Sequence, residues 1–301
     1  MVAHTLRPKT QENYTILTRT HILPELGRIR LTNLQPTHLQ SFYSKKLNEG
    51  YSGRTAQALH GILHKALSQA VRWGLVVRNV SDAVDAPRRV KRPPEILTEA
   101  QARAFLDAVH QDRLYALYVT AITTGMRKAE LLGLRWSDVD FESGAIRVSQ
   151  VALTVHKKGV ILSEPKTEKS RRAIDLPEVA VRALREHKAR QDKIKARSVD
   201  WVENDLVFPT RKGTPIGSRN VLKFFHGSLR RAGLPKVRFH SLRHLHSTLL
   251  LVAGIHPKIV QERLGHSRID ITMDIYSHVI PGMQKPAAAE MDRILGTVST
   301  P

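Results

Sequence analysis

A basic, proline-rich stretch at residues 85–94 constrains the fold more than any other feature of this chain. Its sequence, DAPRRVKRPP, contains three prolines and four basic residues and shows no apolar periodicity. Each proline removes a backbone donor and fixes φ, so neither a continuous helix nor a central strand is expected here. We therefore predict a basic linker over residues 85–96, between a first domain of residues 1–84 and a second domain of residues 97–280.

The first domain is predicted to be entirely helical. Apolar residues recur at three- and four-residue spacing, which places them on one face of a helix. This spacing occurs in three ranges: Thr10–Leu23, Pro36–Leu47 and Ser52–Trp73. We therefore expect three or four packed helices before the linker.

The second domain mixes helical and strand patterns. Thr98–Gln101 (TEAQ) fits a capping box at the start of a helix that ends near His110. Runs rich in β-branched residues predict three short strands: Ala145–Val151, Val160–Leu162 and Arg172–Leu176. Further helices are expected at Leu114–Thr124, Arg127–Leu132, Pro177–Ala196, Ser218–Ala232, Ser241–Val252, Pro257–Leu264 and Asp270–His278. The predicted fold class is mainly α with a small antiparallel β-sheet (α+β).

The charge of the chain indicates a polyanionic partner. There are 48 Lys and Arg residues against 27 Asp and Glu, a formal net charge of +21, and both sides of the linker share the excess. Such an excess favours binding to nucleic acid. A ribosome-associated or simply basic protein would show the same balance, so the charge alone does not identify a DNA enzyme.

The chain contains no cysteine, which excludes disulfides, thiolate nucleophiles and Cys-based zinc sites. It shows no N-terminal apolar signal segment and no run of about 18 apolar residues of the kind that spans a membrane. We therefore expect a cytoplasmic protein, associated with the nucleoid when bound to DNA.

Four motifs in the second domain carry candidate chemistry. They are TGMRKAELLGLRW at Thr124–Trp136, FHSLRHLHST at Phe239–Thr248, LGHS at Leu264–Ser267 and MDIYSHV around Tyr276. In this order they resemble the two arginine boxes, the histidine position and the nucleophile of the tyrosine recombinases, the phage integrase family. The resemblance covers about residues 97–280, and residues 1–84 resemble the family's helical, SAM-like core-binding domain in pattern only.

The resemblance implies a site-specific recombinase that cleaves and rejoins DNA. The implied catalytic residues are Arg127, Lys166, His240, Arg243, His266 and the nucleophile Tyr276, with Glu130 in support. Attack by Tyr276 on phosphorus would form a 3′-phosphotyrosyl link and free a 5′ hydroxyl. The link keeps the energy of the broken bond, so neither ATP nor a metal is expected, in agreement with the lack of a GxxxxGK[ST] sequence.

The residue types suit this chemistry. Attack at phosphorus builds negative charge on the non-bridging oxygens, which fixed cations neutralise. Arginine has a planar fork that matches phosphate, so Arg127 and Arg243 are expected to clamp the scissile phosphate. His240 lies three residues before Arg243, on the same helical face. The resemblance makes His240 the proton acceptor for Tyr276 and His266 a donor to the phosphate.

Two of these residues have simpler interpretations. Arg127 lies one helical turn from Glu130, and a surface ion pair between them would need no phosphate; alternatively Glu130 orients Arg127. Lys166, in SEPKTEKSRR, is the implied general acid that protonates the leaving 5′ oxygen. Lys169 lies three residues further along, and most loop lysines are only solvated.

The histidines and the tyrosine have alternatives of their own. His240 and His244 are four residues apart, a spacing found in metal sites, with His246 and His266 available as further ligands. The region lacks an HExxH-type glutamate, which disfavours that interpretation. Tyr276 would otherwise be a half-buried aromatic residue that anchors a short helix.

DNA is the expected partner, at specific double-stranded attachment sites. The basic residues expected to contact it are Arg54, Arg88, Arg89, Lys91 and Arg92. The family also implies a synaptic tetramer and accessory DNA-bending or directionality proteins. Similar enzymes often carry a further N-terminal arm-binding domain, which we do not expect in this chain.

The tail, residues 281–301, includes an amphipathic stretch, Lys285–Leu295, which is predicted to form a short helix. In similar recombinases such a helix docks on the neighbouring protomer. The simpler interpretation is a helix that packs on its own domain.

Three classes of function are considered: a recombinase for integration and excision of a mobile element, a type IB topoisomerase, and a non-catalytic DNA-binding protein. The topoisomerases usually have lysine at the position of His240, and pure binding needs no tyrosine nucleophile. The sequence therefore favours the recombinase.

Overall fold

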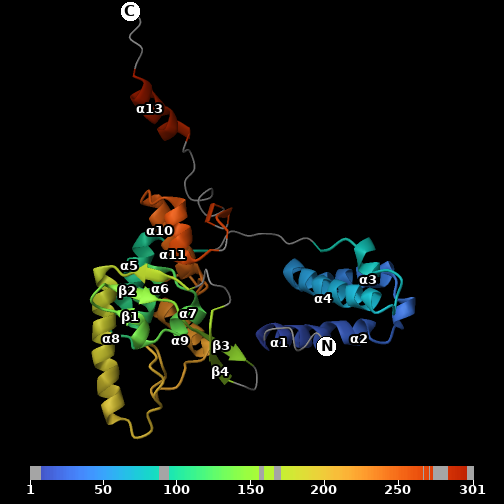
Figure 1. Cartoon of the computed structure of the whole chain (residues 1–301), viewed down its shortest axis with the longest axis horizontal. Coiled ribbons are helices and arrows are strands. Elements are labelled where there is room, and N and C mark those ends of the chain that lie inside the picture. The colour runs from blue at the N-terminus through green and yellow to red at the C-terminus, as the bar shows by residue number, and fades with distance from the viewer. Residues whose placement is uncertain are drawn as a thin grey trace, which may run out of the picture. The chain divides into compact units, whose positions relative to one another are not determined.

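The computed structural model describes residues 8–87, 95–155, 159–165, 171–266, 268–270, 272–273 and 284–296. The chain divides into two compact units, residues 1–93 and residues 94–301 (Figure 1). Most of the predicted linker lies outside the described residues. The predicted fold class is confirmed, because helices dominate both units and the strands form small antiparallel sheets.

The first unit is a small helical domain. Its elements are α1 (Pro8–Leu17), η2 (Thr18–Ile22), α2 (Leu23–Leu26), η3 (Leu31–Asn33), α3 (Pro36–Asn48), α4 (Gly53–Arg72) and η4 (Val80–Ala83). Its core joins the apolar faces of α3 and α4, including Leu39, Phe42 and Leu59. The side chain of Ser52 caps α4 by accepting a hydrogen bond from the backbone N–H of Thr55.

The helix predicted over Thr10–Leu23 is interrupted by one turn of π-helix. The N–H of Leu23 donates to the carbonyl of Thr18, five residues back, where an α-helix would pair residues four apart. Pro24 follows at the start of α2 and has no N–H to donate. The wider turn accommodates this missing donor without ending the helical path.

The second unit surrounds a buried central helix. Its helices are α5 (Glu99–Ala108), α6 (Tyr115–Thr124), α7 (Lys128–Leu132), η5 (Trp136–Asp138), α8 (Glu178–Arg197), α9 (Ser218–Arg231), α10 (Ser241–Val252), α11 (Pro257–Leu264) and α13 (Gln284–Leu295). Residues 116–122 of α6 are all buried, so this helix is enclosed by protein around its whole circumference. Helices α7, α8 and α10 pack against α6, which therefore holds the active-site elements in place.

In the described part of the second unit, five strands form two antiparallel sheets. The strands are β1 (Val139–Asp140), β2 (Ala145–Arg147), β3 (Val151–Val155), β4 (Gly159–Ser163) and β5 (Ala173–Asp175). The first sheet has the order β1-β2-β5, with Ile146 opposite Ile174, and β3 and β4 form a separate hairpin, with Leu153 opposite Ile161.

The single strand predicted over Ala145–Val151 is wrong, since β2 and β3 belong to different sheets. The chain leaves the first sheet between them because Ser149 and Gln150 bind outside it. The hydroxyl of Ser149 donates to Asp138, and the amide of Gln150 donates to the carbonyl of Gly133. A Cβ on Gly133 would lie 2.8 Å from the backbone of Val151, so glycine allows α7 to approach β3.

None of the described helices has the length and apolar character that crossing a membrane requires.

Helix α6 ends at Gly125, whose φ of +62° is left-handed. A Cβ there would lie 2.5 Å from a methyl carbon of Leu264 and 2.7 Å from the ring of His246. Glycine is therefore needed at this position both for its backbone conformation and for its lack of a side chain.

Gly125→Ala is expected to destabilise the protein by about 1–3 kcal/mol more than Gly144→Ala. Gly144 is the matched control, because its φ of +64° is nearly the same but nothing lies within 4 Å of the added Cβ. Both variants carry the backbone strain, and only Gly125→Ala carries the steric overlap. Urea unfolding of the two variants measures the difference; equal losses would contradict the packing at Gly125.

Candidate active site

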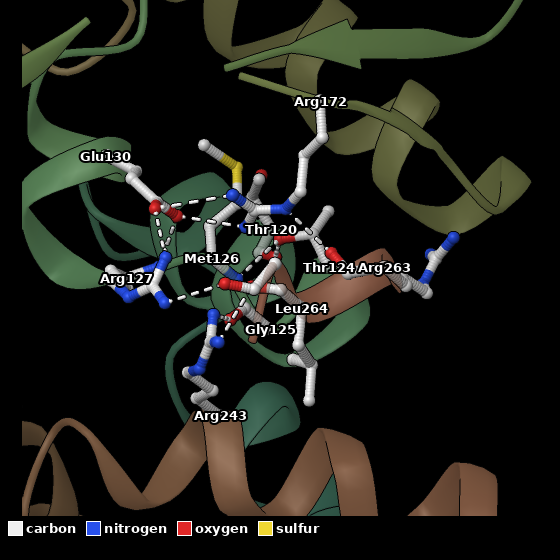
Figure 2. A network of polar contacts seen from close by, with 11 residues as sticks. Thr120, Thr124, Gly125, Met126, Arg127, Glu130, Arg172, Arg243, Arg263 and Leu264 are labelled. Atoms are coloured by element: carbon white, nitrogen blue, oxygen red, sulfur yellow. Dashed lines mark hydrogen bonds and ion pairs between the residues drawn. The ribbon is translucent and has the colours of Figure 1, made fainter. Parts of the chain in front are cut away.

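A buried carboxylate, that of Glu130 in α7, lies at the centre of the candidate site (Figure 2). Its side chain is 2% exposed and is paired with two arginines. Arg127 Nη1 lies 2.8 Å from Oε1, and Arg172 Nη2 lies 3.0 Å from Oε2. Burial alone would raise the pKa of Glu130, but the hydrogen bond and charge of Arg172, together with Arg127, outweigh it and lower the pKa. Glu130 is therefore ionised and serves as the anchor for both guanidinium groups.

Both the backbone and the guanidinium group of Arg127 are fixed by hydrogen bonds. It is the N-cap residue of α7, and its backbone N–H donates to Glu130 Oε2 at 2.8 Å. Its Nη2 donates to the carbonyl of Gly265 at 3.0 Å. The side chain remains 38% exposed, so the guanidinium is fixed and still accessible. The pair with Glu130 is not an ordinary surface ion pair, because the carboxylate is buried.

Arg243 projects from α10 between the C-terminal ends of two other helices. Its Nη1 donates to the carbonyl of Gly125 at 2.8 Å and its Nη2 to the carbonyl of Leu264 at 2.7 Å. These carbonyls close α6 and α11, where helix dipoles favour a positive charge. The arginine is 4% exposed. Its burial, with the neighbouring charge of Arg127, lowers the pKa of Arg243 to about 9.

The structure therefore brings three of the four motifs together. Gly125 and Arg127 come from the first arginine box, Arg243 from the second, and Leu264 and Gly265 from the LGHS motif (Figure 2). The two arginines lie close enough that the charge of Arg127 contributes to the lowered pKa of Arg243. An anion placed against them would relieve this repulsion.

His240 and His266 lie beside these arginines. His240 is the N-cap residue of α10, is exposed, and its ring contacts that of His244 edge-to-face at 5.0 Å between centroids. Although the residue is exposed, its ring is partly withdrawn from water beside His244, and this desolvation, with the charges of His244 and the arginines, lowers the pKa of His240 to about 4. His266 Nδ1 lies 2.9 Å from Thr272 Oγ1, and burial lowers its pKa to about 3. Both rings are therefore neutral at pH 7 in the DNA-free protein.

The interpretation of these histidines as a metal site has little support from the geometry. His246, one of the possible ligands, is 4% exposed, and its Nδ1 lies 2.9 Å from the carbonyl of Ile122. Its ring packs where a side chain at position 125 would otherwise lie. Within the described residues, no three His, Asp or Glu side chains lie together as metal ligands would. His246 is a core residue that supports the backbone at Gly125.

Arg172 belongs to this site although sequence reasoning did not select it. Its side chain is 8% exposed, and its Nε donates to the carbonyl of Arg263 at 2.8 Å. One signal was present in the sequence: Arg172 begins the predicted strand Arg172–Leu176 and shares a face of it with the apolar Ile174, two residues further along. A buried arginine requires an anionic or carbonyl partner, and here it has both.

Several predicted site residues lie outside the described residues. These are Lys166, Tyr276, Arg88, Arg89, Lys91 and Arg92. Most of the predicted helix Asp270–His278 also lies there. Arg54 is described, exposed in the first turn of α4. The roles of these residues stay predictions.

Comparison with known families identifies the chain. A model described as "Phage integrase family" matches residues 95–282, and one described as "Phage integrase, N-terminal SAM-like domain" matches residues 1–47. The chain therefore belongs to the phage integrase family. It is a tyrosine recombinase, an enzyme that breaks and rejoins DNA strands.

Individual relatives and solved structures also place the chain among tyrosine recombinases and integrases. A "Tyrosine recombinase XerC-like" protein of Caldanaerobacter subterraneus subsp. tengcongensis is 35% identical over 284 residues, 88% of this chain and 72% of the relative. The Tn1549 transposon integrase, solved in complex with transposon right end DNA, has a TM-score of 0.82 and 25% identity, over 97% of this chain and 95% of that chain. A lambda integrase tetramer bound to a Holliday junction has a TM-score of 0.63 at 20% identity, over 90% and 72%, and shares the fold.

Arg172→Lys is expected to slow single-turnover DNA cleavage by about 10- to 100-fold with little change in DNA affinity. Lysine keeps the charge but lacks the fork that binds Glu130 and the Arg263 carbonyl together. The pKa of Glu130 should rise, because Arg172 is one of the groups that lower it. On acidification, the variant should therefore lose cleavage activity at a higher pH than the wild type does.

Arg171→Lys is the matched control, because Arg171 is exposed and pairs with the exposed Glu164 at 2.7 Å. This variant should cleave at the wild-type rate. If Arg172→Lys gave the same rate and pH profile as Arg171→Lys, Arg172 would not position the site.

Proposed function

We propose that this recombinase integrates and excises a mobile element at specific DNA sites. The observation that carries the proposal is the meeting of Arg127 and Arg243 at the ends of α6, α7 and α11, supported by Glu130. Arg127 is fixed by its partners and still 38% exposed, so the arrangement presents a positioned cation of the kind that a phosphodiester requires. The similarity to a transposon integrase supports the mobile-element role.

The two arginines would bind the scissile phosphate without leaving their present partners. A guanidinium carries five N–H donors. Arg243 uses one hydrogen on each terminal nitrogen, so each keeps a second hydrogen for a phosphate oxygen. Arg127 binds Glu130 and Gly265 and keeps an exposed edge. Charge that develops on the non-bridging oxygens would meet donors that need no rearrangement.

The proton transfers are assigned to the remaining motif residues. His240 is neutral and exposed, so it would accept the proton of Tyr276 as the tyrosine attacks phosphorus. If Thr272 donates to Nδ1 of His266, Nε2 carries a proton and would donate it to the phosphate. Lys166 would protonate the leaving 5′ oxygen. We propose that cleavage and rejoining need neither a metal nor ATP, because side chains of this protein supply every charge and proton in the scheme.

The wider assembly is also proposed. Double-stranded DNA at attachment sites would contact Arg54 and the basic linker. Four protomers would pair two sites, and the lambda integrase tetramer bound to a Holliday junction supports an assembly of this size. Helix α13 has exposed apolar side chains, including Ile294 at 61% and Leu295 at 72%, which suit docking on a neighbouring protomer. Accessory DNA-bending or directionality proteins, and a cytoplasmic, nucleoid-associated location, complete the proposal.

A strand-exchange assay tests this function against that of a topoisomerase. Two duplexes of different length, each with a candidate attachment site, are incubated with the protein in EDTA. Recombinant duplexes of new length support recombination. Relaxation of supercoiled plasmid without any exchange between sites would instead assign a topoisomerase.

Tyr276→Phe is expected to abolish strand cleavage and leave DNA affinity within about twofold of the wild type, because it removes one hydroxyl and no charge. Gel shift measures the affinity, and a nicked duplex measures the cleavage. Parallel loss of both would contradict the role of Tyr276 as nucleophile.

Arg243→Ala and the pair Arg88→Gln/Arg89→Gln should divide catalysis from binding. Arg243→Ala should slow cleavage by at least about 100-fold with a smaller loss of affinity, because its donors act on charge developed in the transition state. The double variant Arg88→Gln/Arg89→Gln should weaken DNA binding and reduce the number of counterions released on binding by about two. At saturating protein it should still cleave DNA. Gel-shift titrations over a series of salt concentrations, with single-turnover cleavage, measure both effects, and the reverse ranking would refute this division.

A further inference from the structure

A cavity of about 590 Å³ lies in the second unit, away from the site described above. It is bounded by the C-terminal half of α8, by Gln111 and Arg113, and by residues from the loop over 198–211. Figure 1 draws the C-terminal end of α8 far from α10 and α11, which carry Arg243 and Leu264. The cavity is therefore separate from the catalytic arginines.

The lining of this cavity is strongly basic. Four arginines contribute to it: Arg113, Arg190, Arg197 and Arg211. Within the described part of the chain, the lining includes no Asp or Glu side chain. The nearby carboxylates are already paired with other cations, as Lys188–Asp192, Lys195–Glu203, Lys212–Asp200 and Arg231–Asp112. The arginines are therefore left facing the cavity without a carboxylate to balance them.

Two of these arginines are partly withdrawn from solvent. Arg190 Nη2 is buried and has no hydrogen-bond partner among the described residues. Arg113 donates to the carbonyl of Pro209, and burial, together with the charge of Arg211, lowers its pKa. Withdrawing a cation from water costs free energy unless an anion or several acceptors compensate. A bound anion would supply what the chain lacks here.

The rest of the lining restricts the kind of anion. Trp201, Ile194 and Pro209 provide apolar surface. Phosphate matches the guanidinium fork, and a nucleobase stacks well on an indole ring. We propose that this cavity binds a nucleotide, with its phosphate on the arginines and its base against Trp201.

Two sources of this ligand share the same chemistry: a free nucleoside triphosphate, and a nucleotide in a single DNA strand. Titration of the full-length protein in EDTA, followed by the fluorescence of Trp201, separates them. The probes are ATP, a four-residue oligothymidylate, adenosine and a glutamate-rich peptide. Loss of the signal in Trp201→Phe assigns it to this cavity.

The main variant is Arg197→Gln/Arg211→Gln, since both residues are exposed and their loss should not disturb folding. The matched control, Arg182→Gln/Lys193→Gln, removes the same charge from exposed positions of α8 outside the cavity. Arg190→Gln is the second variant. The nucleotide probes are expected to bind at least about tenfold more weakly to both cavity variants and within about twofold of wild type to the control.

Tighter binding of ATP would assign a free nucleotide, and tighter binding of the oligothymidylate would assign a DNA strand; both support the proposal. Equal affinity of the cavity variants and the control would overturn it. So would adenosine binding as tightly as ATP, or saturation by the glutamate-rich peptide alone, which would assign the cavity to a protein partner.

Discussion

The ion pairs of one buried carboxylate determine how this active site is built. Glu130 cannot remain charged inside the protein unless cations compensate it, and removing one partner of a buried pair typically costs about 3–5 kcal/mol. Arg127 and Arg172 supply this compensation from two different segments. Arg172 precedes β5 at the edge of the first sheet and also binds the carbonyl of Arg263 in α11. Its contacts with Glu130 and Arg263 therefore connect α7, the edge of the first sheet and α11. The orientation of Arg127 is thus a consequence of charge balance in the core.

The second determinant is the use of helix ends as acceptors. Arg243 and Arg127 both bind carbonyls at helix C-termini, which allows two like charges to lie near each other before any DNA is present. Their mutual repulsion contributes to the lowered pKa of Arg243. A phosphate would relieve that repulsion, so the site favours an anion in advance of binding. The depressed pKa of His240 fits the same electrostatics, because a ring among cations stays neutral and can accept a proton.

Local patterns predicted much of this molecule, and long-range contacts account for what they missed. The fold class and most helices followed from spacing, and the candidate residues Arg127, Arg243 and His266 followed from the resemblance of the ordered motifs to those of the phage integrase family. The split between β2 and β3 did not, because it depends on side chains of Ser149 and Gln150 bound outside the sheet. Strand β1 has two residues and too little pattern to detect. Arg172 pairs with a carboxylate 42 residues away, which no local spacing reveals.

In the proposed mechanism, Arg127 and Arg243 allow Tyr276 to form a covalent bond to DNA without a metal. The most direct test is to trap that bond, with a suicide duplex that carries a candidate attachment site, in EDTA. The adduct is then digested with trypsin and mapped by mass. Residues 269–293 form a tryptic fragment whose one tyrosine is Tyr276. We predict that the DNA is found on this fragment; an adduct elsewhere, or cleavage that requires a divalent cation, would contradict the account.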